Sequence, residues 1–327
     1  MGLELVDPRN PGLTLHELPT PTLVLGAFQR AASAVIQPEG APALRRRHSG
    51  GPTLWAGPGT LHLLLTLPRP DALVACDPPR LLNRYVRPLL RGLTRLGAPA
   101  HYGGRDWVSV AHRPAAWVGF AHDETSGASL FEAFVALDHP FVPPPSLLAY
   151  PPRRLDPFLG KTPATFAALL GRAPDAGRTA EAIVEAFRRE YGAGSFREGD
   201  LELERTLPLA HDQRPPFAAL EEDVIGFVGA RLGQGGGLGG DFFASEGVAR
   251  GLDAALVSLP ADASTETIER AIREALDGAA GGTIEGLRDP TCLRRVVQAA
   301  QAAQTTQAAT GGVVALRRRV PRRAAAA

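Results

Sequence analysis

The chain has 327 residues, and its 44% apolar content is enough to fill the core of one large domain or two smaller ones. Its 35 basic and 34 acidic residues leave a net charge near +1, so no overall electrostatic attraction draws it to nucleic acid or to an anionic membrane. The longest apolar run, Leu61 to Leu67, is far too short to span a bilayer. The composition therefore predicts a folded, cytoplasmic protein without a nucleic-acid or membrane partner.

The scarcity of cysteine and lysine narrows the chemistry that the chain can perform. Cys76 and Cys292 lie far apart, without a CxxC pattern or an adjacent histidine, which argues against a disulfide framework and against a zinc site. We expect both to be buried thiols. Lys161 is the only lysine, so a mechanism that needs a lysine at any other position is excluded.

The first half of the chain reads as strands around one long helix. Residues 22–26 and 61–67 are short apolar runs bounded by Gly and Pro, which is typical of buried strands. Asp77 and two prolines begin a helix that Gly97 ends. Arginines occupy one face of this helix, which we interpret as a solvated face: Arg80, Arg84, Arg87, Arg91 and Arg95. Further strands are expected at residues 107–111, 116–121 and 129–137, before a proline-rich surface loop over 139–157.

The second half predicts a separate small module. A helix over residues 180–191 ends at Gly192, and the first domain, residues 1–205, ends shortly after it. Residues 206–216 are polar and proline-containing, which indicates a linker. An α+β module is expected over 217–304, and 305–327 reads as a low-complexity, mobile tail. Within the module we expect a strand, a glycine-rich turn and two helices, at residues 224–232, 246–256 and 264–276.

A basic, glycine-containing loop lies between the first two predicted strands and reads Arg46-Arg47-His48-Ser49-Gly50-Gly51. Paired glycines let backbone N–H groups approach a ligand closely, and an arginine beside them offers a planar donor fork to a phosphate. Taken alone, the six residues are an ordinary basic turn. With the preceding run over residues 21–29, however, the loop resembles the signature of the lipoate-protein ligase family.

Looser motifs extend this resemblance from about Pro21 to Gln301. They are Gly103 to Val108, a strand carrying Gly119, the helix before Gly192, and residues 226–228 and 239–242. The resemblance implies an α/β (α+β) fold, with a mixed sheet flanked by helices of the biotin/lipoate ligase type and a small accessory domain. It also implies a substrate and nucleotide site formed by Arg46, Arg47, Ser49, Gly50, Gly51, Pro52, Thr53, Leu54, Trp55, Asp106 and Gly119, in which Arg47 would hold the phosphate.

The family activity consists of activating lipoate or octanoate with ATP and Mg and transferring the acyl group to a lysine of an apo lipoyl domain. The acceptor would belong to a 2-oxoacid dehydrogenase or a glycine-cleavage protein. This sequence departs from the family where a Lys-x-x-Gly motif is expected, because it reads Ala116-Trp117-Val118-Gly119. The residues after the Gly-Gly pair also differ, and no helix is expected before Pro21, so the start is a candidate truncation.

Three functions therefore stay open from the sequence. The first is the family's ATP-dependent ligase. The second is a relative that binds an acyl group, a nucleotide or a lipoyl domain without turnover, and the third is an ATP-independent octanoyl or lipoyl transferase. Losing the electrostatic contact that the family lysine provides would raise the reaction barrier by about a few kcal/mol.

Four other patterns have simpler interpretations. Gly235, Gly237 and Gly240 fit GxGxxG, but a hairpin turn explains them better than a dinucleotide site. The triplet His122-Asp123-Glu124 is interpreted as a solvated loop rather than a metal site, because adjacent side chains point in different directions. Cys76 is interpreted as structural rather than nucleophilic. Lys161 lies in a loop that folding could bring near the site.

Overall fold

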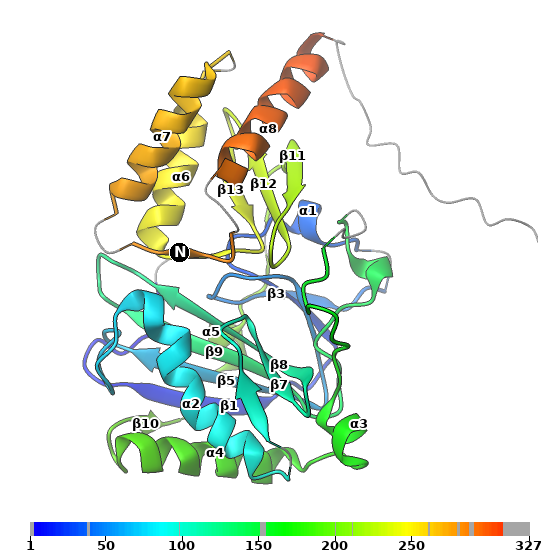
Figure 1. Cartoon of the computed structure of the whole chain (residues 1–327), viewed down its shortest axis with the longest axis vertical. Helices are drawn as coiled ribbons and strands as arrows, with labels where there is room; N and C mark the ends of the chain where they lie inside the picture. The colour runs from blue at the N-terminus through cyan, green and yellow to red at the C-terminus, as the bar shows by residue number, and fades with distance from the viewer. Residues whose placement is uncertain are drawn as a thin grey trace, which may run out of the picture.

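The computed structural model describes residues 3–37, 40–97, 99–150, 155–199, 201–210, 212–260, 262–279, 282–287 and 291–309. Its largest layer is a mixed seven-stranded sheet in the order β10-β1-β5-β9-β8-β7-β6 (Figure 1). β1 and β10 are parallel, and the other neighbours are antiparallel. The strands are β1 (Gly12–Glu17), β5 (Thr60–Leu67), β6 (Ala100–Tyr102), β7 (Trp107–Val110), β8 (Arg113–His122), β9 (Ser129–Ala136) and β10 (Arg197–Glu198).

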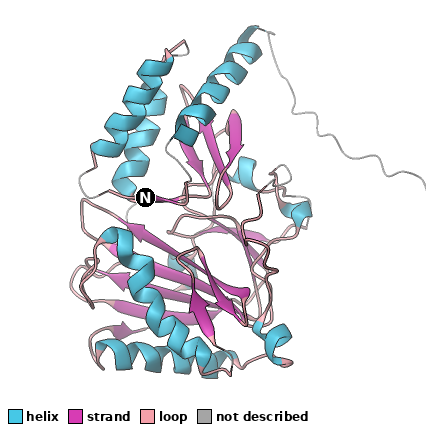
Figure 2. Cartoon of the chain, in the orientation of Figure 1, coloured by secondary structure: helices cyan, strands magenta, loops and turns pink. Residues whose placement is uncertain are grey.

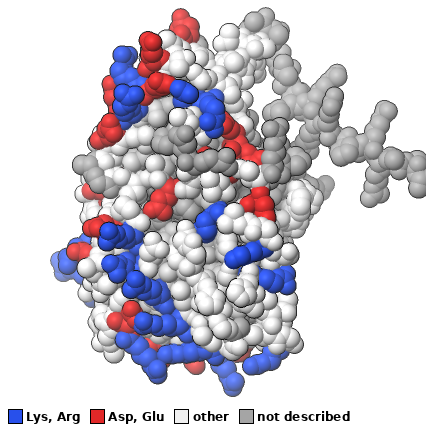
Figure 3. Space-filling model, viewed as in Figure 1, with Lys and Arg blue, Asp and Glu red and all other residues white. Residues whose placement is uncertain are grey.

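Two helices cover one face of this sheet, α2 (Leu81–Thr94) and α4 (Ala176–Tyr191). The short helix η1 (Pro78–Arg80) leads into α2, whose apolar residues face the main core. The two helices pack closely where Gly92 meets Ile183, because a side chain at Gly92 would come 2.7 Å from the Ile183 Cα. The arginines of α2 form a band along its outer face, as the sequence predicts (Figure 3).

A second, three-stranded sheet stands beside the first in the order β3-β2-β4. It consists of β2 (Thr22–Leu25), β3 (Ala43–Arg46) and β4 (Leu54–Ala56), with the short helix α1 (Ala31–Ala34) after β2. β3 runs parallel to β2, whereas β4 is antiparallel to it. The loop that joins β3 to β4 is the Ser-Gly-Gly segment singled out in the sequence.

The C-terminal part forms its own core from a three-stranded sheet and three helices (Figure 2). Its elements are β11 (Ala219–Glu222), β12 (Phe227–Arg231), β13 (Gly237–Gly240), α6 (Glu246–Ser258), α7 (Thr265–Asp277) and α8 (Thr291–Ala309). A two-stranded ribbon, β14 (Phe243–Ala244) with β15 (Ile284–Glu285), lies against β8 of the large sheet. The short elements η2 (Pro145–Leu147), α3 (Phe166–Leu170) and α5 (Leu203–Thr206) belong to the connecting segments.

These elements confirm the α/β fold class with a mixed sheet flanked by helices. Several element predictions were wrong in detail. β1, β3 and β11 were not expected, β12 begins at Phe227 rather than at residue 224, and α8 continues five residues past the point where the tail was placed. The rest of the predicted tail, residues 310–327, lies outside the described residues. Among the described helices, none has both the length and the hydropathy needed to cross a membrane.

Candidate functional site

The Ser-Gly-Gly loop is held between the large sheet and the C-terminal ribbon. The Gly51 N–H donates to the Phe242 carbonyl at 2.9 Å. A side chain at Gly50 would come 2.9 Å from the Phe243 Cα and closer still to the Phe242 carbonyl, so only glycine permits this approach. The paired glycines therefore serve a close backbone contact with the C-terminal part of the same chain.

Arg47 holds the loop from inside. Its guanidinium donates to the carbonyls of Gly50 (3.0 and 2.6 Å), Pro52 (2.7 Å) and Val24 (3.1 Å). It also stacks 4.1 Å from the centroid of the Trp117 ring. Burial lowers the pKa of Arg47 to about 10, which still leaves it protonated at neutral pH. Arg47 thus donates four hydrogen bonds to backbone carbonyls of its own chain. A contact between Arg47 and a phosphate stays a prediction.

A buried row of polar side chains anchors the other side of the loop. The Ser49 hydroxyl donates to one carboxylate oxygen of Glu132. His62 Nε2 lies 2.8 Å from the other oxygen, and His62 Nδ1 lies 3.3 Å from His16 Nε2. Ser49, His62 and Glu132 are fully buried. Burial opposes ionisation of Glu132, but the bond from His62 and the charge of Arg47 outweigh it, so its pKa lies below the ordinary value.

This row of buried polar side chains was not among the predicted site residues, although the sequence contains a signal for it. His62 and Glu132 are polar residues inside strands that are otherwise almost entirely apolar. These strands, β5 and β9, are neighbours in the sheet, with His62 opposite Phe134. Two buried polar residues on adjacent strands indicate a mutual hydrogen bond, because an unpaired one would be costly.

A cavity of about 440 Å³ opens beside the loop. Four predicted site residues, Pro52, Thr53, Leu54 and Asp106, form part of its wall. Most of the remaining wall comes from the proline-rich stretch over residues 139–157, for which the sequence predicts only a surface loop. The other lining residues are Trp117, Phe141, Val142, Pro143, Pro145, Leu148, Tyr150, Pro157, Phe158 and Ile225. Cavities of this size and apolar character are typical of small-molecule sites, which span about 300–1,000 Å³.

Asp106 directly precedes β7, and Trp117 lies on the neighbouring strand β8, where it pairs with Trp107. Ala116, where the resemblance expects a lysine, is fully buried. A side chain at Gly119 would come 2.7 Å from the Trp117 Cζ2 atom and 2.9 Å from the Phe243 ring. Gly119 thus makes room for the indole that forms one wall of the cavity.

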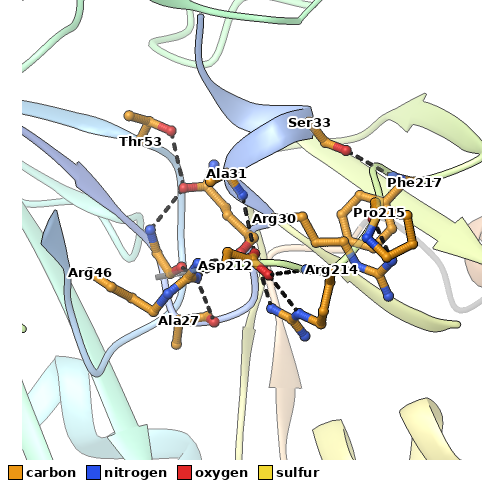
Figure 4. A network of polar contacts seen from close by, with 12 residues as sticks. Ala27, Arg30, Ala31, Ser33, Arg46, Thr53, Asp212, Arg214, Pro215 and Phe217 are labelled. Atoms are coloured by element: carbon orange, nitrogen blue, oxygen red, sulfur yellow. Dashed lines mark hydrogen bonds and ion pairs between the residues drawn. The ribbon is translucent and has the colours of Figure 1, made fainter. Parts of the chain in front are cut away.

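The other seven predicted site residues are not among those that line this cavity, and two of them, Arg46 and Trp55, have contacts away from it. Arg46 donates to the carbonyls of Gly26 (2.9 Å), Ala27 (3.1 Å) and Gln29 (2.6 Å) and pairs with Asp212 at 3.3 Å. Figure 4 shows this group beside a second arginine, Arg30, whose guanidinium donates to the Pro215 carbonyl at 2.8 Å. Trp55 packs against His139, with 5.2 Å between ring centroids. Arg46 therefore connects β3 to the segment that leads into the C-terminal part.

The remaining candidates lie elsewhere. Cys76 is half-buried rather than buried, and desolvation raises its pKa to about 11, which suits an unreactive thiol. Lys161 is exposed, with its Nζ 4.9 Å from the centroid of the Trp107 ring. Glu124 is not in a solvated loop as expected, because it accepts the Gly247 N–H at 2.7 Å in the first turn of α6. The glycine-rich segment forms a turn only as far as Gly236, since residues 237–240 are β13.

No protein-family model and no curated protein matches the chain. Among solved structures, P. falciparum LipL1 in complex with lipoate is similar over 88% of this chain and 86% of that one, with a TM-score of 0.55 and 11% identity. A bi-partite lipoate protein ligase from Thermoplasma acidophilum covers 60% of this chain and 76% of its own, with a TM-score of 0.46 and 17% identity. A biotin protein ligase from Aquifex aeolicus in complex with biotin and ATP covers 56% and 70%, with a TM-score of 0.34 and 10% identity. At these identities the likeness to LipL1 concerns the fold.

Proposed function

We propose that this chain is a lipoate-protein ligase-like protein whose cavity binds the hydrocarbon chain of a lipoyl or octanoyl group. The observation that carries the proposal is an apolar cavity of about 440 Å³ that is lined by the residues following Gly50 and Gly51. Its wall consists mainly of proline, aromatic and aliphatic side chains, and burying an acyl chain against them gains about 0.8 kcal/mol per CH₂ group. The similarity to a lipoate-bound structure of the same fold supports this ligand class.

The activity that the resemblance implies is ATP-dependent. In that reaction lipoate or octanoate would be activated with MgATP and passed to a lysine of an apo lipoyl domain. The retained Ser-Gly-Gly loop supports this function, because its residues lead directly into the cavity wall at Pro52, Thr53 and Leu54. We also propose that the chain is divided as the family resemblance implies, into a catalytic domain over 1–205, a linker over 206–216 and an accessory module over 217–304.

A second candidate function is acyl binding without turnover. The contacts of Arg47 favour it, because this buried guanidinium donates to the carbonyls of Gly50, Pro52 and Val24 where the ligase reaction would need it to hold a phosphate. It is also favoured by Ala116, because a buried methyl group stands where the family lysine would supply positive charge.

Intact-mass spectrometry distinguishes these functions. An apo lipoyl domain is incubated with the full chain, octanoate or lipoate, and MgATP, beside a reaction with an octanoyl-carrier donor and a control with an active family enzyme. Acylation with MgATP identifies a ligase, and acylation only from the carrier identifies a transferase. No mass gain, together with measurable binding of an octanoyl compound, identifies a non-catalytic binder.

The cavity itself is tested by narrowing its rim. Val142 is 36% exposed and lines the cavity, whereas Val257 is 51% exposed on α6 and does not. We expect Val142→Trp to weaken octanoyl binding at least tenfold and Val257→Trp to leave it unchanged. Equal affinities for the two variants would refute the assignment of the ligand to this cavity.

A further inference from the structure

Large apolar side chains that stay in water are concentrated in the segment that forms much of the cavity wall. Six such side chains are exposed in the described part of the chain, and three of them, Val142, Leu155 and Leu159, lie within residues 139–161. Val142 also lines the cavity. Single exposed apolar residues are ordinary, but several in one segment beside a cavity mark a surface that another molecule covers.

Leu159 is the most exposed of the six, with 64% of its surface in solvent. It directly follows Pro157 and Phe158, which both line the cavity. The Phe158 ring packs against Phe141 and Trp107, with ring centroids 6.0 and 6.4 Å apart. Phe158 therefore contributes to the wall, whereas the next side chain along the chain stays in solvent.

The backbone at Leu159 is unfavourable for a leucine. Its φ is +54°, in the left-handed region that glycine and asparagine adopt far more readily than a bulky residue. The turn is nevertheless well fixed. Asp156 accepts the Phe158 N–H at 2.8 Å and also the Gly160 N–H, and the Phe158 carbonyl accepts the Lys161 N–H at 3.1 Å. Leu159 belongs to none of the buried apolar clusters, so its side chain gives the fold little packing in return for this strain.

Both ends of this turn are tied to the large sheet. Arg105, just before β7, donates to the Pro157 carbonyl at 3.2 Å. Arg113, the first residue of β8, donates to the Thr162 carbonyl at 2.9 Å. Leu159 is thus presented on a fixed turn, and a contact that is already ordered loses little conformational entropy when a partner binds.

We propose that Leu159 is a docking contact for the acceptor domain that receives the acyl group. This inference rests on the proposed function, because an acceptor lysine can reach a ligand in the cavity only when its domain covers the opening. Val142, which is exposed and also lines the cavity, places that opening beside the same segment. The partner that fits is a folded domain with an apolar side chain on the surface that carries its acceptor lysine.

Biolayer interferometry with the full chain and an immobilised apo lipoyl domain of a 2-oxoacid dehydrogenase tests this contact. Leu159→Asn removes the apolar side chain and keeps a residue suited to the left-handed turn, so urea unfolding should show a protein at least as stable as the wild type. We expect this variant to bind the domain about tenfold more weakly. Leu159→Met keeps an apolar side chain and should bind within about twofold of the wild type. Leu209→Asn is the matched control, because Leu209 is 52% exposed and lies outside residues 139–161, and it should bind as the wild type does.

Calorimetry with octanoate separates docking from ligand binding, since Leu159→Asn should keep the wild-type affinity for octanoate. A loss of octanoate affinity would place Leu159 on the ligand and overturn the docking contact, as would equal affinities of wild type and Leu159→Asn for the domain. A wild type that forms a dimer in analytical ultracentrifugation, with a monomeric Leu159→Asn, would assign this surface to a second copy and also overturn it. If the wild type binds octanoate but not the domain, the docking contact fails and the acyl-binding cavity stands. If the wild type does not bind octanoate, the proposed function itself fails.

Discussion

Replacing Glu132 by glutamine removes a buried negative charge while keeping nearly the same shape. In the wild-type protein this carboxylate accepts hydrogen bonds from Ser49 and from His62, the latter at 2.8 Å, and all three side chains are fully buried. A hydrogen bond to a charged group contributes about 1.5–3 kcal/mol, whereas one between neutral groups contributes about 1 kcal/mol. Weakening two such bonds should lower the free energy of unfolding by about 2–3 kcal/mol.

The pH dependence of this loss identifies its cause. The pKa of Glu132 is lowered in the folded protein, so its contribution to stability is present above the pKa of the unfolded chain, near 4.3, and disappears as pH falls through the folded value. The stability difference between wild type and Glu132→Gln should therefore be full at pH 7 and should shrink as the pH falls below the unfolded pKa of about 4.3. The groups facing this carboxylate are Ser49, His62 and, through its charge, Arg47.

Urea denaturation followed by tryptophan fluorescence at pH 7, 5, 4 and 3 measures this difference. Glu185→Gln is the matched control, because Glu185 is an exposed carboxylate on α4 that pairs with Arg189 at 2.6 Å. Surface pairs contribute little, so this control should unfold close to the wild type at neutral pH. A Glu132→Gln protein as stable as the wild type, or a deficit that does not change with pH, would refute the reasoning.

Three further outcomes follow from the same structure. Gly119→Ala should lower stability by about 1–3 kcal/mol in thermal or urea unfolding, because its methyl group would meet the Trp117 ring. Arg46→Ala should lower stability by about 3 kcal/mol, since three carbonyls lose the Arg46 donor and Asp212 keeps an ion pair only with Arg214, and unchanged unfolding would show that this contact is dispensable. Desolvation lowers the pKa of His16 to about 3, so its ring resonances should not titrate between pH 5 and 8 in NMR spectra, and a midpoint near 6.5 would show a solvated ring.

The main strands of the large sheet and the helix α2 were predictable because the spacing of apolar residues in each segment already indicates its secondary structure. The helix over α2 follows from leucines at helical spacing and from Gly97, and the continuous apolar run of β5 indicates a buried strand before any contact is known. β1 was not predicted because its residues are unevenly buried and form no continuous apolar run. β3 was not predicted because it contains two arginines, which are more typical of a loop than of a strand. Their strand character comes from pairing with β5 and β2 in the folded sheet.

The candidate site divides in the same way. The resemblance to the lipoate-protein ligase family assigned Pro52, Thr53, Leu54 and Asp106 to one site, and all four line the cavity. The sequence could not determine that the proline-rich stretch supplies half of the residues that line the cavity, because that depends on packing between segments distant in the chain.

Only the tertiary structure decided what the charged and polar groups do. Arg47 and Arg46 both look like ligand-binding arginines in the sequence, yet in the fold both donate to backbone carbonyls. Composition and spacing cannot reveal this, since a guanidinium binds whichever acceptors the fold brings to it. For the same reason, the row from Ser49 through Glu132 to His62 exists only once β3, β5 and β9 are brought together in the folded chain.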